Sequence, residues 1–183
     1  MLEINFTPFP ELLTGRMILR KISDRDAAQI FKLRSDERVM KYIGKQPAVS
    51  LDEAKNFIAV IIDSLKSNDG ITWAMAMKEA PEILIGTIGL WRILKEHFRA
   101  EIGYMLLPEY WRKGLMKEAI LKVIKFGFDE LKIHSIEGRI NAGNVASANI
   151  LESTGFVKEA HFKEDFFFNG KFEDTAIYSI LNQ

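Results

Sequence analysis

The segment 101–116 carries the residues whose types and spacing could bind an anion. A strand-like run ends in a proline, a short loop with Arg112, Lys113 and Gly114 follows, and a helical pattern then begins. The first N–H groups of a helix have no partners inside it, and the helix dipole is positive there, so this arrangement suits phosphate. Gly114 lets the backbone approach the anion, and its two neighbours add charge. A solvated basic loop before a core helix is the alternative, and composition alone leaves both open.

Other patterns that would indicate chemistry are missing. The chain has neither the G-x-x-x-x-G-K-[ST] nor the G-x-G-x-x-G signature, which argues against ordinary kinases and NAD enzymes. It has no Gly-x-Ser-x-Gly elbow of a serine hydrolase. Its lack of cysteine excludes disulfides, thiolate metal sites and a cysteine nucleophile. His97, His134 and His161 are far apart in the sequence, so no metal site is expected.

Hydrophobic periodicity predicts the elements that must position this loop. Strands are expected at 16–22, 71–77, 83–94, 99–107, 134–140, 156–168 and 171–181. Helices are expected at 23–40, 51–66, 116–131 and 144–153. Capping boxes open the first two helices, and Asn169-Gly170 marks a hairpin. The order β-α-α-β-β-β-α-β-α-β-β predicts an α/β fold, with a mixed sheet and helices on both faces.

Composition describes an ordinary globular chain of one domain, 1–183. Hydrophobic residues make up 48% and charged residues 27% of the sequence. Basic and acidic residues balance at 25 each, which gives no overall field for nucleic acid, so direct nucleic-acid binding is not expected. The N-terminus lacks the features of a signal peptide, and the best apolar run, 57–62, is far too short for a membrane span. We therefore expect a cytoplasmic protein.

The stretch 100–119, AEIGYMLLPEYWRKGLMKEA, resembles the coenzyme A-binding motif of the GNAT superfamily of N-acetyltransferases. It is most similar to the ribosomal-protein-alanine (RimJ/RimL) type. Further matches follow in the family's order, at 13–20, 85–90, 144–147, 151–156 and 174–181. Two positions depart from the superfamily pattern: Trp111 replaces a Gln or Arg, and Met116 replaces a Gly or Ala.

The resemblance implies a GNAT-like, mostly antiparallel central sheet flanked by helices on both faces, with acetyl-CoA as co-substrate and no metal. It implies that backbone amides hold the coenzyme pyrophosphate at Arg112, Lys113, Gly114, Leu115 and Met116. The strand ending at Tyr104, Met105 and Leu106 would pair with the pantetheine arm. Asn144 would bond the pantetheine, and Ser147 would lie near the thioester sulfur.

Acetyl transfer to an amine requires that the amine lose a proton and that the leaving thiolate gain one. Glu101 is the first candidate base, with Glu164 and Asp165 in reserve. Ser147 is the first candidate to hydrogen-bond the sulfur, and Tyr104 is a weaker alternative acid. Each has a structural alternative: a salt-bridged carboxylate for Glu101, a helix hydrogen bond for Ser147, and a packing role for Tyr104.

The predicted function is acetyl transfer to a primary amine, foremost a protein N-terminal α-amine of the ribosomal-protein type. An α-amine has a pKa of about 7.7–8.0 and lysine about 10.4, so a weak base suffices for the former. A polyamine, amino sugar or antibiotic is the alternative acceptor, and a non-catalytic coenzyme A-binding module is the alternative class. Acetyl and longer acyl donors both stay open. The C-terminal strands are compatible with a homodimer, and no membrane partner is expected.

Overall fold

The computed structural model describes residues 1–182. Its strands are β1 (Leu12–Leu13), β2 (Met17–Lys21), β3 (Ile71–Met77), β4 (Ala80–Leu94), β5 (Arg99–Leu106), β6 (Ser135–Asn141), β7 (Val157–Phe168) and β8 (Lys171–Leu181). Its α-helices are α1 (Ala27–Ser35), α2 (Glu37–Met40), α3 (Leu51–Lys66), α4 (Leu115–Asp129) and α5 (Val145–Ser153). Short 3-10 turns occur at Asp24–Asp26, Lys95–His97 and Pro108–Tyr110.

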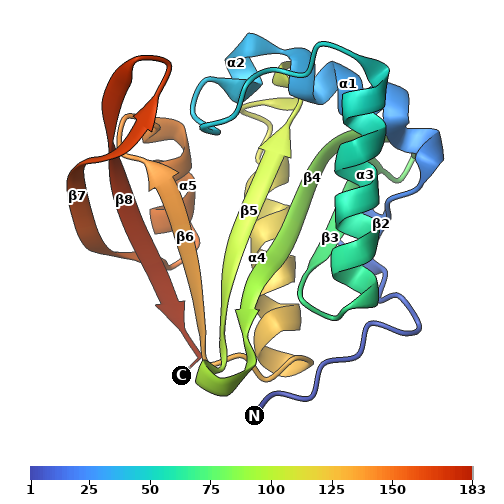
Figure 1. Cartoon of the computed structure of the whole chain (residues 1–183). Helices are drawn as coiled ribbons and strands as arrows, with labels where there is room; N and C mark the ends of the chain where they lie inside the picture. The colour runs from blue at the N-terminus through green and yellow to red at the C-terminus, as the bar shows by residue number, and fades with distance from the viewer. Residues whose placement is uncertain (183) are drawn as a thin grey trace.

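The strands form one sheet in the order β1-β2-β3-β4-β5-β6-β8-β7. Every neighbouring pair is antiparallel except β5 and β6, which are parallel. Helices α1 and α3 cover one face and α4 and α5 the other (Figure 1). This confirms the predicted mixed, mostly antiparallel sheet with helices on both faces.

Two apolar cores hold the layers together. Trp73 and Met75 point from β3 into the core beneath α4, and Ala74 points into the core beneath α1 and α3. Successive strand residues face opposite sides, so a strand covered on both faces is apolar throughout. The run ITWAMAM of β3 has this character.

The predicted helix 23–40 is wrong as a single element. A 3-10 turn, α1 and α2 replace it, and Asp36 separates the two helices in an extended conformation, with φ −75° and ψ 112°. The Asp36 carboxylate accepts a hydrogen bond from the N–H of Arg38 at 2.9 Å. An Asp side chain competes in this way with helix hydrogen bonding, so it stops one helix and caps the next. The short strand β1 was also not predicted.

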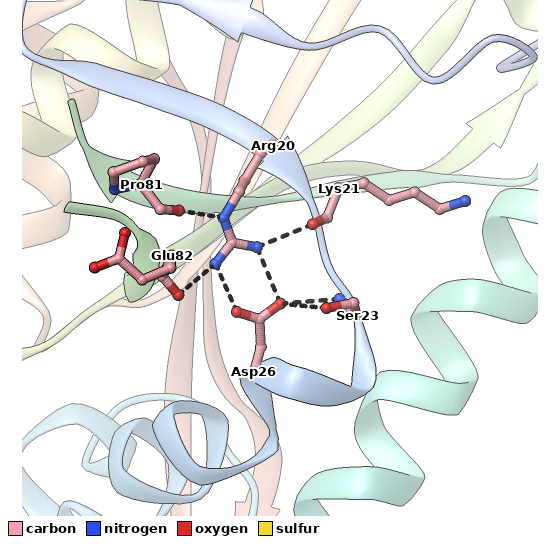
Figure 2. A network of polar contacts seen from close by, with 6 residues as sticks. All are labelled: Arg20, Lys21, Ser23, Asp26, Pro81 and Glu82. Atoms are coloured by element: carbon pink, nitrogen blue, oxygen red, sulfur yellow. Dashed lines mark hydrogen bonds and ion pairs between the residues drawn. The ribbon is translucent and has the colours of Figure 1, made fainter. Parts of the chain in front are cut away.

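Arg20 joins β2 to the 3-10 turn before α1 and to the start of β4, a set of contacts we call the Arg20 clasp (Figure 2). Its guanidinium donates to both carboxylate oxygens of Asp26, at 3.0 and 2.6 Å. It also donates to the carbonyls of Lys21, Pro81 and Glu82. Asp26 is buried, so the clasp is a shielded ion pair whose hydrogen bonds are satisfied.

The sheet opens between β5 and β6. These strands pair only from Arg99 with Ser135 to Glu101 with Glu137, although β5 continues to Leu106 and β6 to Asn141. From their paired ends the two strands diverge (Figure 1). We call the space between them the gap. No helix formed by residues 1–182 is long and apolar enough to cross a membrane.

Candidate active site

The loop 111–114 presents a row of free backbone donors at the start of α4. Arg112 and Gly114 have left-handed backbones, with φ 59° and 74°. Within residues 1–182, no acceptor takes a hydrogen bond from the N–H groups of 112–116. Consecutive free N–H groups at a helix N-terminus form an anion-binding concavity. These residues therefore fit the predicted anion site.

Every second residue of β5 turns its backbone N–H and C=O groups toward the gap. Leu107 donates its N–H to the carbonyl of Ile85 on β4 at 2.9 Å. Because neighbouring residues of a strand turn their polar groups to opposite sides, those of Leu106 and Tyr104 face the gap. The Leu106 carbonyl accepts from the Trp111 indole N–H at 2.7 Å. Tyr104 has no β6 residue opposite it, so its backbone groups are left for an extended ligand.

Tyr104 and Ser147 approach one another from opposite sides of the gap. The Tyr104 hydroxyl is the one buried side-chain polar atom of residues 1–182 that has no hydrogen-bond partner. Burial raises the pKa of Tyr104 to about 12, and the nearby Ser147 hydroxyl opposes this rise. A buried hydroxyl without a partner is costly, which points to a missing ligand atom. Ser147 lies in the first turn of α5, where its N–H donates to Asn144 Oδ1 at 3.1 Å.

Glu101 lies at the base of the gap, on the last paired position of β5. It is 9% exposed and forms an ion pair with Arg92, whose Nη1 lies 3.1 Å from Oε2. Arg92 adopts a left-handed backbone with φ 46°. Both side chains line a cavity of about 360 Å³ on the face of α1 and α3. Glu101 is therefore salt-bridged, as in the structural alternative to a catalytic base, and it also lines a cavity.

The cavity, which we call the acidic cleft, lies between β4, β5, β6, the β7–β8 hairpin and the loop after α2. Its charged lining consists of Glu101, Asp165, Glu173, Asp174, Arg92 and Arg139. Four acidic and two basic groups give it a formal charge of −2. A Cβ added to Gly44 would lie 2.8 Å from the Phe166 ring, so the loop after α2 packs closely on the hairpin.

The structure separates the two reserve bases. Asp165 lines the acidic cleft, and Glu164 does not. Glu164 has a left-handed backbone, φ 52°, and its N–H donates to Asp174 Oδ1 at 2.9 Å. Asp174 is also paired with His161, whose Nε2 lies 2.6 Å away. These two contacts with Asp174 shape the hairpin beside the cleft.

Sequence reasoning missed Arg92, Arg139 and Glu173. No motif contains them, and they meet only because β6 pairs with β8 while β4 pairs with β5. It also assigned no role to Arg16, although the match at 13–20 includes that residue. Residues 1–182 contain no group of three or more His, Asp or Glu arranged to hold a metal ion.

Comparisons with known proteins agree with this geometry. The family model of the acetyltransferase (GNAT) domain matches residues 16–157. An uncharacterized N-acetyltransferase of Bacillus subtilis, YoaA, is 38% identical over 94% of this chain and 97% of its own length. The spermidine N-acetyltransferase of Vibrio cholerae, solved with CoA and spermine, has a TM-score of 0.80 and 27% identity. That match covers 90% of this chain and 95% of the Vibrio cholerae chain.

The RimL acetyltransferase of ribosomal L7/L12, solved with coenzyme A, has a TM-score of 0.85 over 94% of this chain and 98% of its own. At 15% identity this likeness shows the fold alone. The open sheet, the free amides before α4 and the family match over most of the chain agree. The chain belongs to the GNAT family of acetyltransferases and is an N-acetyltransferase of that type.

Proposed function

We propose that the protein transfers the acetyl group of acetyl-CoA to a primary amine that enters through the acidic cleft. The observation that carries this proposal is the gap in the sheet, which lies between the free amides before α4 and the acidic cleft. A β-strand without a neighbour offers its backbone to an extended ligand. One end of the gap suits a phosphate and the other a cation.

The residues that would hold acetyl-CoA follow from these contacts. The amides of 112–116 would bind its pyrophosphate, and the side chains of Arg112 and Lys113 would add charge. The backbone groups of Tyr104 and the N–H of Leu106, which face the gap, would pair with its pantetheine, and Asn144 would contact the same arm. When bound, acetyl-CoA supplies an activated acyl group on a thiol leaving group.

In the transfer, the amine nitrogen bonds the acetyl carbon and the C–S bond breaks, so the protonated amine gives up two protons, one to a base and one that offsets the protonation of the leaving thiolate. Glu101 would take one from the ammonium form of the acceptor, directly or through water, because it lines the cleft at the base of the gap. Ser147 or Tyr104 would hydrogen-bond the departing sulfur. A Tyr104 pKa of about 12 keeps that hydroxyl protonated at neutral pH, so it can donate.

Two acceptor classes fit the cleft. The sequence favours a protein N-terminal α-amine, which a weak base can deprotonate. The charge of the cleft favours a polyamine, because a formal charge of −2 attracts a ligand with several ammonium groups. The relation to a spermidine acetyltransferase supports the second class.

Binding and acceptor assays test the proposal in that order. Calorimetry with acetyl-CoA and with free CoA should give micromolar dissociation constants for the parent protein. Turnover is then measured with spermidine and with peptides that begin with alanine. A polyamine enzyme should lose activity with added salt and in Asp165→Asn/Glu173→Gln, whereas a peptide enzyme should depend on neither. Failure of both CoA forms to bind would exclude the proposal.

Variants of the proton-transfer groups separate an enzyme from a CoA-binding module. Glu101→Gln and Ser147→Ala should each keep CoA affinity and lose turnover by about tenfold or more. Tyr104→Phe is the matched test for the alternative acid. Unchanged turnover in a variant removes that residue from the mechanism.

A further inference from the structure

Arg16 connects the N-terminal strand segment to the loop before α4. It precedes β2, and its guanidinium Nε donates to Glu118 Oε2 on α4 at 2.8 Å. Its backbone N–H donates to the other carboxylate oxygen of Glu118, also at 2.8 Å. Its Nη1 donates to the carbonyl of Lys113 at 2.8 Å. We call this set of contacts the Arg16 grip.

The bond to the Lys113 carbonyl has a consequence for the anion site. The carbonyl of Lys113 and the N–H of Gly114 belong to one planar, trans peptide unit, so they point in opposite directions. Holding the carbonyl against Arg16 therefore turns the N–H of Gly114 away from Arg16. That N–H is one of the free donors at the start of α4.

Glu118 anchors the same turn from the helix side. Its N–H donates to the Gly114 carbonyl at 3.1 Å, which is the first hydrogen bond of α4. Its carboxylate accepts from Arg16 through both oxygens. The peptide units on either side of Gly114 are thus fixed to one arginine that lies 102 residues from Glu118 in the sequence.

Stability alone does not account for this arrangement. The Arg16 side chain is 48% exposed, and exposed ion pairs contribute only about 0–1 kcal/mol. The grip nevertheless uses three donors, one to the Lys113 carbonyl of the loop and two to Glu118 in the first turn of α4. Its remaining nitrogen, Nη2, lies 3.5 Å from where a Cβ of Gly114 would be. Within residues 1–182, Nη2 makes no hydrogen bond.

We propose that Arg16 is a positioning residue for the pyrophosphate loop: by holding the Lys113 carbonyl, it orients the Gly114 N–H toward the anion. This inference rests on the proposed function, because it presumes that the anion is the pyrophosphate of coenzyme A. It predicts a role in binding the phosphates that is separate from binding the pantetheine arm.

The test compares two ligands in three variants. Dissociation constants are measured for CoA by calorimetry and for pantetheine, which lacks the pyrophosphate and nucleotide, by ligand-observed NMR. Arg16→Ala should weaken the binding of CoA about tenfold, as expected for a lost charge-assisted contact, and leave the affinity for pantetheine unchanged. Arg16→Lys should recover only part of the loss, because lysine lacks the planar fork. Lys125→Ala, which breaks an exposed pair at the far end of α4, should match the parent.

Two results would overturn the inference. If Arg16→Ala binds CoA with an affinity within twofold of the parent, the loop does not depend on Arg16 for binding. Equal weakening of CoA and pantetheine would indicate a general structural loss. If the parent protein binds CoA and Arg16→Ala gives either result, only the positioning role is refuted. A parent that does not bind CoA refutes the proposed function as well.

Discussion

Two arginines four residues apart, Arg16 and Arg20, each bind a helix carboxylate in different surroundings. The Arg20 clasp holds Asp26, which is 2% exposed, and donates to three backbone carbonyls (Figure 2). The Arg16 grip holds Glu118, whose side chain is 22% exposed, and leaves Nη2 without a partner within residues 1–182.

The difference separates stability from binding. A buried pair is screened little, and removal of one partner leaves a charge without compensation. An exposed pair is weakened by water and salt, so it adds little to folding. We therefore expect the Arg20 clasp to control unfolding and the Arg16 grip to control the geometry of the anion site.

The largest expected effect is on the clasp. Asp26→Ala leaves the half-buried Arg20 guanidinium with its three carbonyl contacts but without its carboxylate, which should cost about 3 kcal/mol of unfolding free energy. Urea unfolding of the variant and parent measures it. CoA affinity, measured under conditions where the variant is folded, should equal that of the parent. A loss below about 1 kcal/mol would mean that the clasp resembles a surface pair.

The contrast between the arginines could not be predicted from the sequence. Both arginines belong to the short family match at 13–20. Arg20 is six residues from its partner Asp26, whereas Arg16 is 102 residues from Glu118. Periodicity predicted most of the sheet and helices, because these depend on local spacing. It missed the break at Asp36, where a side chain competes for backbone donors.

The candidate site was predictable only in part. The loop with Gly114 follows from a strand, a basic turn and a helix in sequence, and its φ of 74° agrees with the glycine. The acidic cleft does not follow from any motif, because Asp165 and Glu173 reach it through the pairing of β6, β8 and β7. Long-range pairing of this kind leaves no local pattern.

A pair of glycines sharpens the comparison at the level of the backbone. Gly114 and Gly170 have similar left-handed conformations, with φ 74° and 78°, and a Cβ has room at both. Gly→Ala at either should cost about 1–2 kcal/mol through backbone strain, measured by urea unfolding. Only Gly114→Ala should also weaken the binding of CoA, by about tenfold, since it shifts the backbone N–H donors of the anion site. Equal CoA affinity in both variants would contradict the assignment of this loop.

The smallest expected effect concerns the carboxylate of the Arg16 grip. Burial raises the pKa of Glu118, but hydrogen bonds from Thr14 and Arg16 outweigh it and lower the pKa below its ordinary value. A lowered folded-state pKa means that the contribution is present above the unfolded pKa of about 4.3 and is lost as pH falls through the folded value. The grip should therefore be unchanged from pH 5 to 8.

Glu118→Gln keeps the shape of the side chain and removes its charge. It should change the unfolding free energy by less than about 1 kcal/mol and weaken CoA about threefold, because Arg16 keeps its bond to Lys113. In a double-mutant cycle with Arg16→Ala, the two losses should not add, since both act on one peptide unit. Additive losses would show that Glu118 and Arg16 act on the anion site independently, and the grip would then be two separate contacts.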